Sequence, residues 1–160
     1  MKMILSVAAA AVALVAAPAA AQDSTSDFTG GRAGVNLGFY NDDVIGFDDF
    51  SYGAEIGYDF DAGGAVLGIS GEIQDSADIT RELAVTARAG ARVGTKGLIY
   101  ATGGYTNLRA YGFSLDGFKI GAGAEVAVGS QAFVKAEQLY YNYELGVDGW
   151  QTRLGAGIRF

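Results

Sequence analysis

Three observations predict an all-β chain that folds as an eight-stranded antiparallel up-and-down transmembrane β-barrel. Apolar and polar residues alternate with period two along successive segments, which is the signature of strands. The connections between these segments alternate between tight turns and longer loops, as in transmembrane barrels. Aromatic residues gather near the ends of the apolar faces, where a membrane protein meets its two water–lipid interfaces.

The N-terminal segment has the composition of an export signal. Lys2 supplies a positive charge, an apolar run follows from Ile4 to Ala17, and residues 19–21 are small. The run is shorter than the roughly 20 apolar residues that a transmembrane helix needs. We therefore expect a cleaved signal peptide over 1–21, a mobile polar lead-in over 22–27 and the barrel domain over 28–160.

The strands are expected over residues 32–39, 52–60, 65–73, 83–93, 98–107, 118–128, 134–141 and 150–160. No window of these segments holds a stripe of period 3.6, so helices are excluded. In the first four strands the apolar faces are Ala33, Val35, Leu37 and Phe39; Tyr52, Ala54, Ile56, Tyr58 and Phe60; Ala65, Leu67, Ile69 and Ile73; and Leu83, Val85, Ala87, Ala89, Ala91 and Val93.

The last four strands include the clearest and the least regular patterns. The apolar faces of the sixth and eighth are Phe118, Ile120, Ala122, Ala124, Val126 and Val128; and Trp150, Thr152, Leu154, Ala156, Ile158 and Phe160. In the fifth, Ile99, Ala101 and Tyr105 oppose Thr102. In the seventh, Gln138 falls on the apolar side and Leu139 on the polar side, so either a bulge shifts the register or the exchange is tolerated near an interface.

The apolar face is expected to meet lipid, because the opposite face holds too few charges to be a solvent surface. Glycine interrupts that sparse face repeatedly. The aromatic rim of the apolar face is formed by Phe39, Tyr58, Phe60, Phe118, Phe133, Tyr140, Trp150 and Phe160. A soluble lipocalin-like barrel or a sandwich is the alternative.

The polar face would line a lumen that side chains nearly fill. It receives acids and bases in similar numbers: Glu55, Asp59, Glu72, Glu82, Glu125 and Glu137, against Arg32, Arg88, Arg92, Lys119, Lys135, Arg153 and Arg159. Isolated buried charges are costly, so we expect an ion-pair network that includes Arg32, Glu55, Glu72, Arg88, Glu125, Lys135, Glu137 and Arg153. Such a network either holds the barrel together or gates a narrow pore.

The connections predict which end of the barrel is which. Tight turns are expected at 61–64, 94–97 and 128–131, and longer loops at 41–50, 75–81, 109–117 and 143–149, with both termini on the short-turn side. The first long loop contains Asp42, Asp43, Asp48 and Asp49. These carboxylates could bind a divalent cation, bridge through cations to lipopolysaccharide phosphates, or simply be solvated.

The composition excludes several classes of function. The chain has no cysteine and no histidine, so thiolate nucleophiles, zinc sites built on those residues and a Ser-His-Asp triad are absent. A net charge of −7 with few basic residues argues against nucleic-acid binding. We therefore expect no enzyme, no cofactor and no resident metal.

Several motifs resemble a known family. They are Tyr58-Asp-Phe-Asp61, Tyr100-Ala-Thr-Gly-Gly-Tyr105, Gly121-Ala-Gly-Ala-Glu125, Val134-Lys-Ala-Glu137 and Gly155-Ala-Gly-Ile-Arg-Phe160. The chain is similar to the outer-membrane β-barrel family that includes opacity-type proteins and the barrel of outer membrane protein A. The resemblance covers nearly all of residues 28–160.

The resemblance implies a place in the bacterial outer membrane, with outer-membrane lipids and lipopolysaccharide as partners. It also implies that the barrel-assembly machinery reads a signal formed by Arg153, Gly155, Ile158 and Phe160. Enzymatic small barrels of this kind use a histidine, which this chain lacks. The expected role is structural or surface-interacting, with an unidentified surface partner; a narrow porin-like channel for small solutes and a loop-mediated adhesin are the alternatives.

Overall fold

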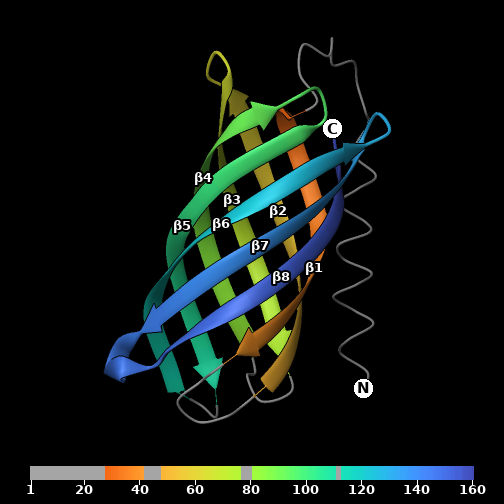
Figure 1. Cartoon of the computed structure of the whole chain (residues 1–160). Coiled ribbons are helices and arrows are strands. Elements are labelled where there is room, and N and C mark those ends of the chain that lie inside the picture. The colour runs from red at the N-terminus through yellow and green to blue at the C-terminus, as the bar shows by residue number, and fades with distance from the viewer. Residues whose placement is uncertain (1–27, 42–47, 77–80, 111–112) are drawn as a thin grey trace.

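The computed structural model describes residues 28–41, 48–76, 81–110 and 113–160. Within them the chain forms a closed barrel in which each strand pairs antiparallel with the next and β8 pairs with β1, so the predicted fold class is confirmed (Figure 1). The strands are β1 (Gly30–Asn41), β2 (Asp48–Asp61), β3 (Ala65–Ser76), β4 (Arg81–Val93), β5 (Gly97–Ala110), β6 (Phe113–Val128), β7 (Ala132–Tyr143) and β8 (Asp148–Arg159). The expected signal peptide and lead-in, together with Asp42 and Asp43, lie outside the described residues.

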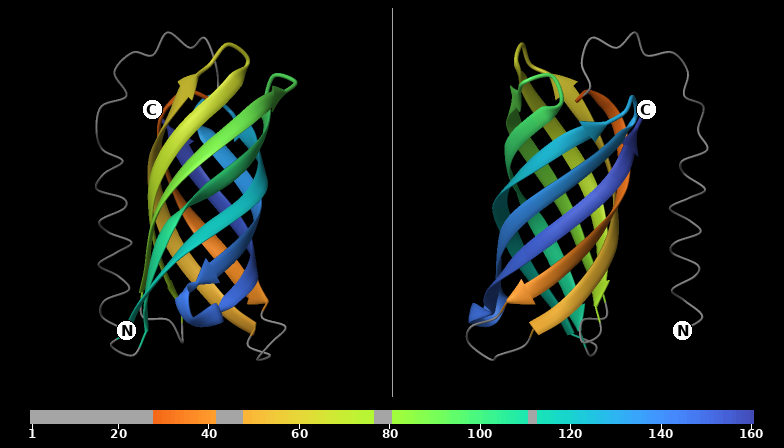
Figure 2. Two further views of the ribbon diagram at one scale, coloured as in Figure 1. Left: turned by 90° about the vertical axis from the view of Figure 1, so that its left-hand side faces the viewer. Right: turned by 45° about the vertical axis from the view of Figure 1, so that its right-hand side comes forward.

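The two ends of the barrel differ in how the strands are connected. At the short-turn end, residues 62–64, 94–96 and 129–131 join the strands, and Gly63, Gly94 and Gly129 adopt positive φ angles that these tight turns require. At the other end, which we call the long-loop end, residues 42–47, 77–80 and 111–112 and the 3₁₀ turn η1 (Glu144–Gly146) join them. Both views in Figure 2 place the C-terminus at the short-turn end.

The strands extend further at the long-loop end than the sequence pattern predicts. β5 and β6 pair as far as Ala110 and Phe113, so the predicted loop over 109–117 is wrong. β2 begins at Asp48, so Asp48 and Asp49 belong to a strand and not to the predicted loop. Beyond the apolar part of these strands the outward side chains are polar, as at Asn107 and Asp116, but the backbone pairing between β5 and β6 continues.

The burial pattern follows the predicted alternation. Along β4, the outward side chains from Arg81 to Ala89 are exposed and those between them are buried. In β7 the ladders to both neighbours are continuous, so the bulge interpretation is wrong. Gln138 faces outward and accepts a hydrogen bond from Thr152 at 2.8 Å, whereas Leu139 is wholly buried. One prediction is wrong. Phe133 was assigned to the aromatic rim of the outward face, but its side chain is buried inside the barrel, because it lies on the same face of β7 as Lys135.

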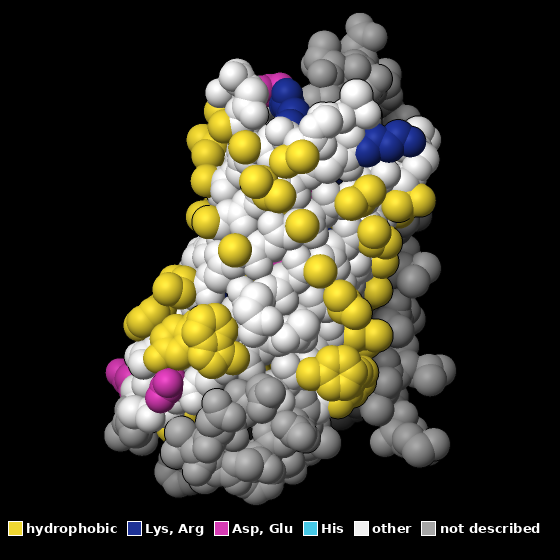
Figure 3. All heavy atoms as spheres, viewed as in Figure 1, with side chains coloured by type: hydrophobic (Ala, Val, Ile, Leu, Met, Phe, Trp, Pro, Cys, Tyr) yellow, Lys and Arg dark blue, Asp and Glu magenta, His cyan; other side chains and the backbone are white. Residues whose placement is uncertain are grey.

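The outward face is an apolar band with aromatic residues at both rims. Aromatic pairs Phe39–Phe50 and Tyr140–Trp150 lie at the long-loop end, with ring centroids 5.3 and 5.2 Å apart. Tyr58 packs against Phe60 toward the short-turn end, at 4.9 Å. Figure 3 shows charged side chains gathered at the two ends of the visible face and hydrophobic ones over the band between them. This distribution matches a lipid-facing surface bounded by two interfaces.

In the part of the chain that the structure describes, no helix has the length and apolar character needed to cross a membrane.

The assignment of the lipid-facing side can be tested by depth. Leu154 is 55% exposed and lies midway along β8 between Trp150 and Ile158. Val126 is also outward but pairs with Gly97, the first residue of β5. We expect Leu154→Arg to lower the unfolding free energy in lipid by about 2–4 kcal/mol and Val126→Arg by about 0–1 kcal/mol, because a guanidinium near an interface reaches water. Urea titration of the folded barrel in vesicles measures both; equal losses would contradict the depth assignment.

Candidate functional site

In the part of the chain that the structure describes, ionised side chains from every strand except β5 converge in the barrel interior. The buried charged groups of the described chain are Glu55, Asp59, Glu82, Glu125 and Glu137, with Arg32, Arg88, Lys119, Lys135, Arg153 and Arg159; Glu72 belongs to the same network with its side chain 6% exposed. The predicted Arg92 does not join them. It pairs with Asp61 at 2.5 Å on the short-turn rim, where both side chains are partly exposed.

The ion pairs form a continuous path that starts near the short-turn end. Arg88 joins Glu125 to Asp59, with Nη1–Oε2 and Nη2–Oδ2 distances of 2.9 and 2.6 Å. Arg32 then joins Asp59 to Glu55, with Nε–Oδ2 and Nη1–Oε1 distances of 3.2 and 2.6 Å. Acids and bases alternate along the path, so each charge has an opposite charge on both sides.

The path continues through the middle of the barrel. Lys135 Nζ lies 2.5 Å from Glu55 and 3.2 Å from Glu137. Arg153 then contacts Glu137 and Glu72, at 2.6 Å in each case. These residues come from β2, β3, β7 and β8, so the network ties opposite walls of the barrel together.

Toward the long-loop end the network passes into hydrogen-bonded neutral groups. Lys119 Nζ lies 2.8 Å from Glu72 and 3.4 Å from Glu82. Glu82 accepts hydrogen bonds from Thr106 at 2.8 Å and from the Tyr40 hydroxyl at 2.9 Å. The charges are thereby matched across the lumen, and no carboxylate of the path lacks a donor.

Asp59 forms ion pairs with more basic side chains than any other acid of the network. It accepts contacts from Arg88, Arg32 and, through Oδ2 at 2.9 Å, Arg159. Arg159 also pairs with Glu125. Three guanidiniums therefore depend on one fully buried carboxylate, and its removal would leave a buried excess of positive charge.

Small residues provide the space that these long side chains occupy. A Cβ placed on Gly155 would lie 2.4 Å from Asn36 Oδ1 and 2.8 Å from Lys135 Cε. A Cβ on Gly68 would meet the Asp59 carboxylate and lie 3.2 Å from Arg88 Cγ. Glycine at these lumen positions is required by close approach of the ion-pair network.

Apolar clusters lie at both ends of the network, and no pattern in the sequence indicated them. The short-turn plug consists of Phe28, Val66, Leu98, Tyr100 and Ala127. The long-loop plug consists of Leu108, Leu139, Tyr141 and Tyr143, with Tyr40 and Leu115 packed against it. The lumen is thus a charged middle between two apolar ends.

The plugs contact the charged middle through aromatic faces. The Arg88 guanidinium lies 4.9 Å from the Tyr100 ring centroid, and Lys119 Nζ lies 5.5 Å from that of Tyr141. The Arg159 guanidinium lies 5.5 Å from the Phe28 ring centroid and 5.3 Å from that of Phe133. These cation–π contacts explain why aromatic side chains, placed on the polar phase of their strands, are stable there.

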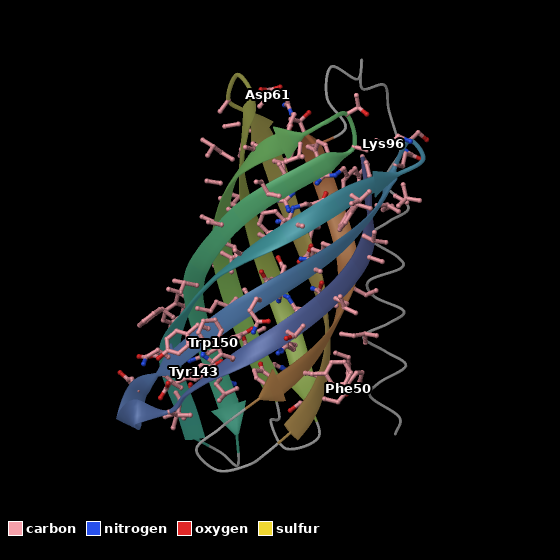
Figure 4. All side chains as sticks on the ribbon, viewed as in Figure 1. Phe50, Asp61, Lys96, Tyr143 and Trp150 are labelled. Atoms are coloured by element: carbon pink, nitrogen blue, oxygen red, sulfur yellow. The ribbon has the colours of Figure 1, made fainter. Side chains whose placement is uncertain are left out.

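Two acids at the barrel ends lie outside the membrane band. The hydrogen bond from Arg92 and one from the Gly63 N–H hold the pKa of Asp61 below its usual value. At the long-loop end, hydrogen bonds from Tyr105 and Asn107 lower the pKa of Asp116. Figure 4 labels Asp61 and Lys96 at one end and Phe50, Tyr143 and Trp150 at the other, which marks the two rims.

The other predicted site residues are those of the assembly signal and those of the acidic loop. Arg153 and Gly155 face the lumen, while the Phe160 N–H and carbonyl pair with Gly31 at 2.8 and 2.7 Å and close the seam between β1 and β8. Ile158 lies on the same seam, opposite Ala33. Of the acidic loop residues, only Asp48 and Asp49 fall within the described chain, as the first residues of β2. Within the described residues no cluster of acidic side chains is arranged to hold a metal ion.

Comparison with known proteins gives one family and a set of similar folds. Residues 7–160 match the family model described as outer membrane protein beta-barrel domain. The N-terminal β-barrel domain of Pseudomonas aeruginosa OprF superposes with a TM-score of 0.55 at 19% identity, covering 82% of this chain and 99% of that one. Neisserial surface protein A gives 0.55 at 12% identity, with 81% and 96% covered.

A third similar structure is Ail, the attachment invasion locus protein of Yersinia pestis, with a TM-score of 0.54 at 19% identity and coverages of 82% and 97%. These identities are low, so the structures establish a shared fold only. The comparison with curated proteins found no match.

The contribution of the ion-pair network to stability can be measured by substituting two aspartates of β2, Asp59 and Asp61. Asp59→Asn keeps the shape of the side chain but removes the charge that faces Arg32, Arg88 and Arg159, and we expect it to lower the unfolding free energy by about 3–5 kcal/mol. Asp61→Asn, which breaks an exposed pair with Arg92, serves as the matched control and should change little. Urea unfolding followed by tryptophan fluorescence of Trp150 measures both; equal effects would show that the lumen network does not dominate stability.

Proposed function

The chain belongs to the outer membrane protein β-barrel domain family, and we propose that it serves the bacterial outer membrane as a closed, non-conducting barrel with a structural and surface-interacting role. The observation that carries this proposal is the lumen: a continuous path of buried ion pairs, bounded by an apolar plug at each end.

A water-filled path for solutes would require these contacts to open. Every charge of the middle layer is paired and nearly inaccessible to solvent, in contrast to the polar, hydrated lumen of a porin. Separating one buried pair leaves an uncompensated charge, which is costly. The same two plugs would also have to move. These features favour the structural role over a narrow porin-like channel.

The lumen is equally unsuited to catalysis. A general acid or base needs an accessible group that can exchange a proton with a substrate. Here Glu72 is occupied by Lys119, Arg153 and Thr86, and Glu137 by Arg153, Lys135 and the Tyr100 hydroxyl. The sequence also contains no histidine. The proposed role is therefore non-enzymatic.

The polar surface at the long-loop end is available to partners in solution, and adhesion there is the second candidate function. The paired β5–β6 hairpin carries an exposed polar cluster of Tyr105, Asn107, Ser114 and Asp116, connected by hydrogen bonds. Such a rigid, solvated surface is suited to binding because little conformational entropy is lost on contact. Two proteins of similar fold have names that refer to a surface or to attachment, which agrees with this candidate.

The chain would be exported through its cleaved signal peptide, and the barrel-assembly machinery would read Arg153, Gly155, Ile158 and Phe160. Lipids and lipopolysaccharide would surround the apolar band. The acidic residues Asp42, Asp43, Asp48 and Asp49 would contact the surface layer at the long-loop end, with or without bridging cations.

Planar-bilayer recordings test the closed lumen. We expect no conductance steps from the wild-type barrel. Glu137→Ala should also remain silent, because the apolar contacts of both plugs remain although Arg153, Lys135 and the Tyr100 hydroxyl lose a partner. A porin reconstituted in the same bilayer provides the positive control. Discrete steps from the wild type would establish the channel, and steps from Glu137→Ala alone would indicate a gated pore.

Adhesion is tested by removing the hairpin cluster without shortening the barrel. Asn107→Ala, Ser114→Ala and Asp116→Ala together should leave heat-modifiable migration on unboiled gels intact, because these side chains lie outside the lumen. Adherence of bacteria displaying the protein to cultured epithelial cells is then compared. Reduced adherence of the triple variant would support the second candidate, and unchanged adherence would count against it.

A further inference from the structure

A hole and a projecting side chain lie next to each other on the outward face of the barrel. A groove of about 670 Å³ extends over β2, β3, β4 and β5. Gly71 lies within it, and a Cβ at that position would have no heavy atom within 4 Å. Val85, the cross-strand partner of Gly71, is 66% exposed, more than any other large hydrophobic side chain of the described residues. Open space on β3 and a projecting branched side chain on β4 therefore share one register position.

The β3–β4 pair is complementary to itself under a two-fold rotation. Two copies in one membrane have the same orientation, so a two-fold axis that relates them runs along the membrane normal. An axis that passes between Gly71 and Val85 places Val85 of each copy over Gly71 of the other. Close packing of this kind favours association in a bilayer, where hydrophobicity gives no preference because lipid tails are as apolar as the side chains.

The tilt of the strands determines which charges the same axis brings together. In Figure 1 a line drawn down the barrel toward the long-loop end crosses β6, β7 and β8 in turn, so the strand number increases in that direction. A line that starts between β3 and β4 at the middle of the barrel therefore reaches the long-loop rim beside β5 and β6. Among the described residues, the exposed charges of those two strands at this rim are Arg109 and Asp116.

Arg109 and Asp116 have opposite charges and are available for pairing between copies. The ion pairs of the described chain include neither residue. Asp116 accepts hydrogen bonds from Tyr105 and Asn107, both at 2.5 Å and both through Oδ1, which leaves Oδ2 for a further donor. The two residues lie on adjacent strands, so the two-fold axis places Arg109 of each copy opposite Asp116 of the other.

A phosphate-bearing lipid is a poorer occupant of this face. Two acids, Asp75 on β3 and Asp116 on β6, flank the rim arginines of β4 and β5, so no excess of positive charge selects a phosphate. A second copy supplies a carboxylate to Arg109 and a guanidinium to Asp116. It also supplies the branched side chain that fits over Gly71.

We propose that the protein forms a two-fold dimer in the bilayer. Val85 of each copy packs over Gly71 of the other, and Arg109 of each copy pairs with Asp116 of the other. The packing contact brings the two sheets close, and the two ion pairs at the rim fix the rotation of one barrel against the other. The dimer uses only the outward face, so it is compatible with a closed lumen and with an open one.

Energy transfer between donor-labelled and acceptor-labelled copies in phosphatidylcholine vesicles measures the dimer. The label is attached through Ser130→Cys in the β6–β7 turn, since the chain has no cysteine of its own, and heat-modifiable migration on unboiled gels verifies folding. We expect transfer that rises with the protein-to-lipid ratio. Gly71→Leu should abolish it, because the new side chain occupies the space that receives Val85. The matched control is Ala124→Leu on the outward face of β6, which should leave the transfer unchanged.

Charge reversal tests the pairing between copies. Arg109→Glu and Asp116→Lys should each weaken self-association by roughly tenfold, because both rim pairs become repulsive. An equal mixture of the two variants should restore the transfer, since each rim contact of the mixed dimer then joins opposite charges. Pairing within one copy cannot be restored by mixing, so this rescue is specific to a dimer.

The outcomes separate the dimer from its alternatives. Transfer no higher than that of randomly distributed copies at every protein-to-lipid ratio would overturn the proposal. Transfer that survives Gly71→Leu, or that mixing does not restore, would overturn the assigned axis. Loss of the wild-type transfer on addition of lipid A would show that lipid occupies the groove in place of a second copy. None of these measurements involves conductance, so failure here leaves the closed-lumen proposal standing, and the reverse also holds.

Discussion

Charges buried in a lumen without bulk water have to be paired, and most features of this barrel follow from that requirement. Each acid of the path from Glu125 to Glu72 lies between bases that come from different walls, and Glu82 at the end of the path pairs with Lys119. The pairs fix which inward residues face one another. The inward glycines supply the space for the crossing side chains, as at Gly68 and Gly155. The apolar plugs then restrict water at both ends, which strengthens the pairs between them.

The alternation of residues was sufficient to predict the strands, their faces and the lipid-facing side, because the side-chain period of a strand is two regardless of its surroundings. The prediction failed where a residue was assigned to a face by its type and not by its position in the alternation. Phe133 was assigned to the aromatic rim although it shares its phase with Lys135 and Glu137, and the structure places it inside. Likewise, Leu139 looked anomalous only because the long-loop plug was not foreseen.

Partner identity within the lumen could not be read from the sequence. Which arginine meets which acid depends on the stagger of the strands around the barrel, and this is a property of closure. Arg92 shows the limit: its phase points inward, but its position near the end of β4 brings it to Asp61 on the rim. Loop lengths failed for a related reason. Polar outward residues on β5 and β6 resemble a loop in composition, while the backbone pairing continues to Ala110 and Phe113.

The choice of ion pairs over an apolar filling has a physical explanation in the lipid environment. A buried ion pair is often no more stabilising than a well-packed apolar replacement. In a bilayer, however, hydrophobicity does not distinguish the inside of a barrel from its outside, because lipid tails are as apolar as leucine. Charges can be satisfied only in the lumen, so the network fixes which face of each strand turns inward. The outward face is then free to vary in shape.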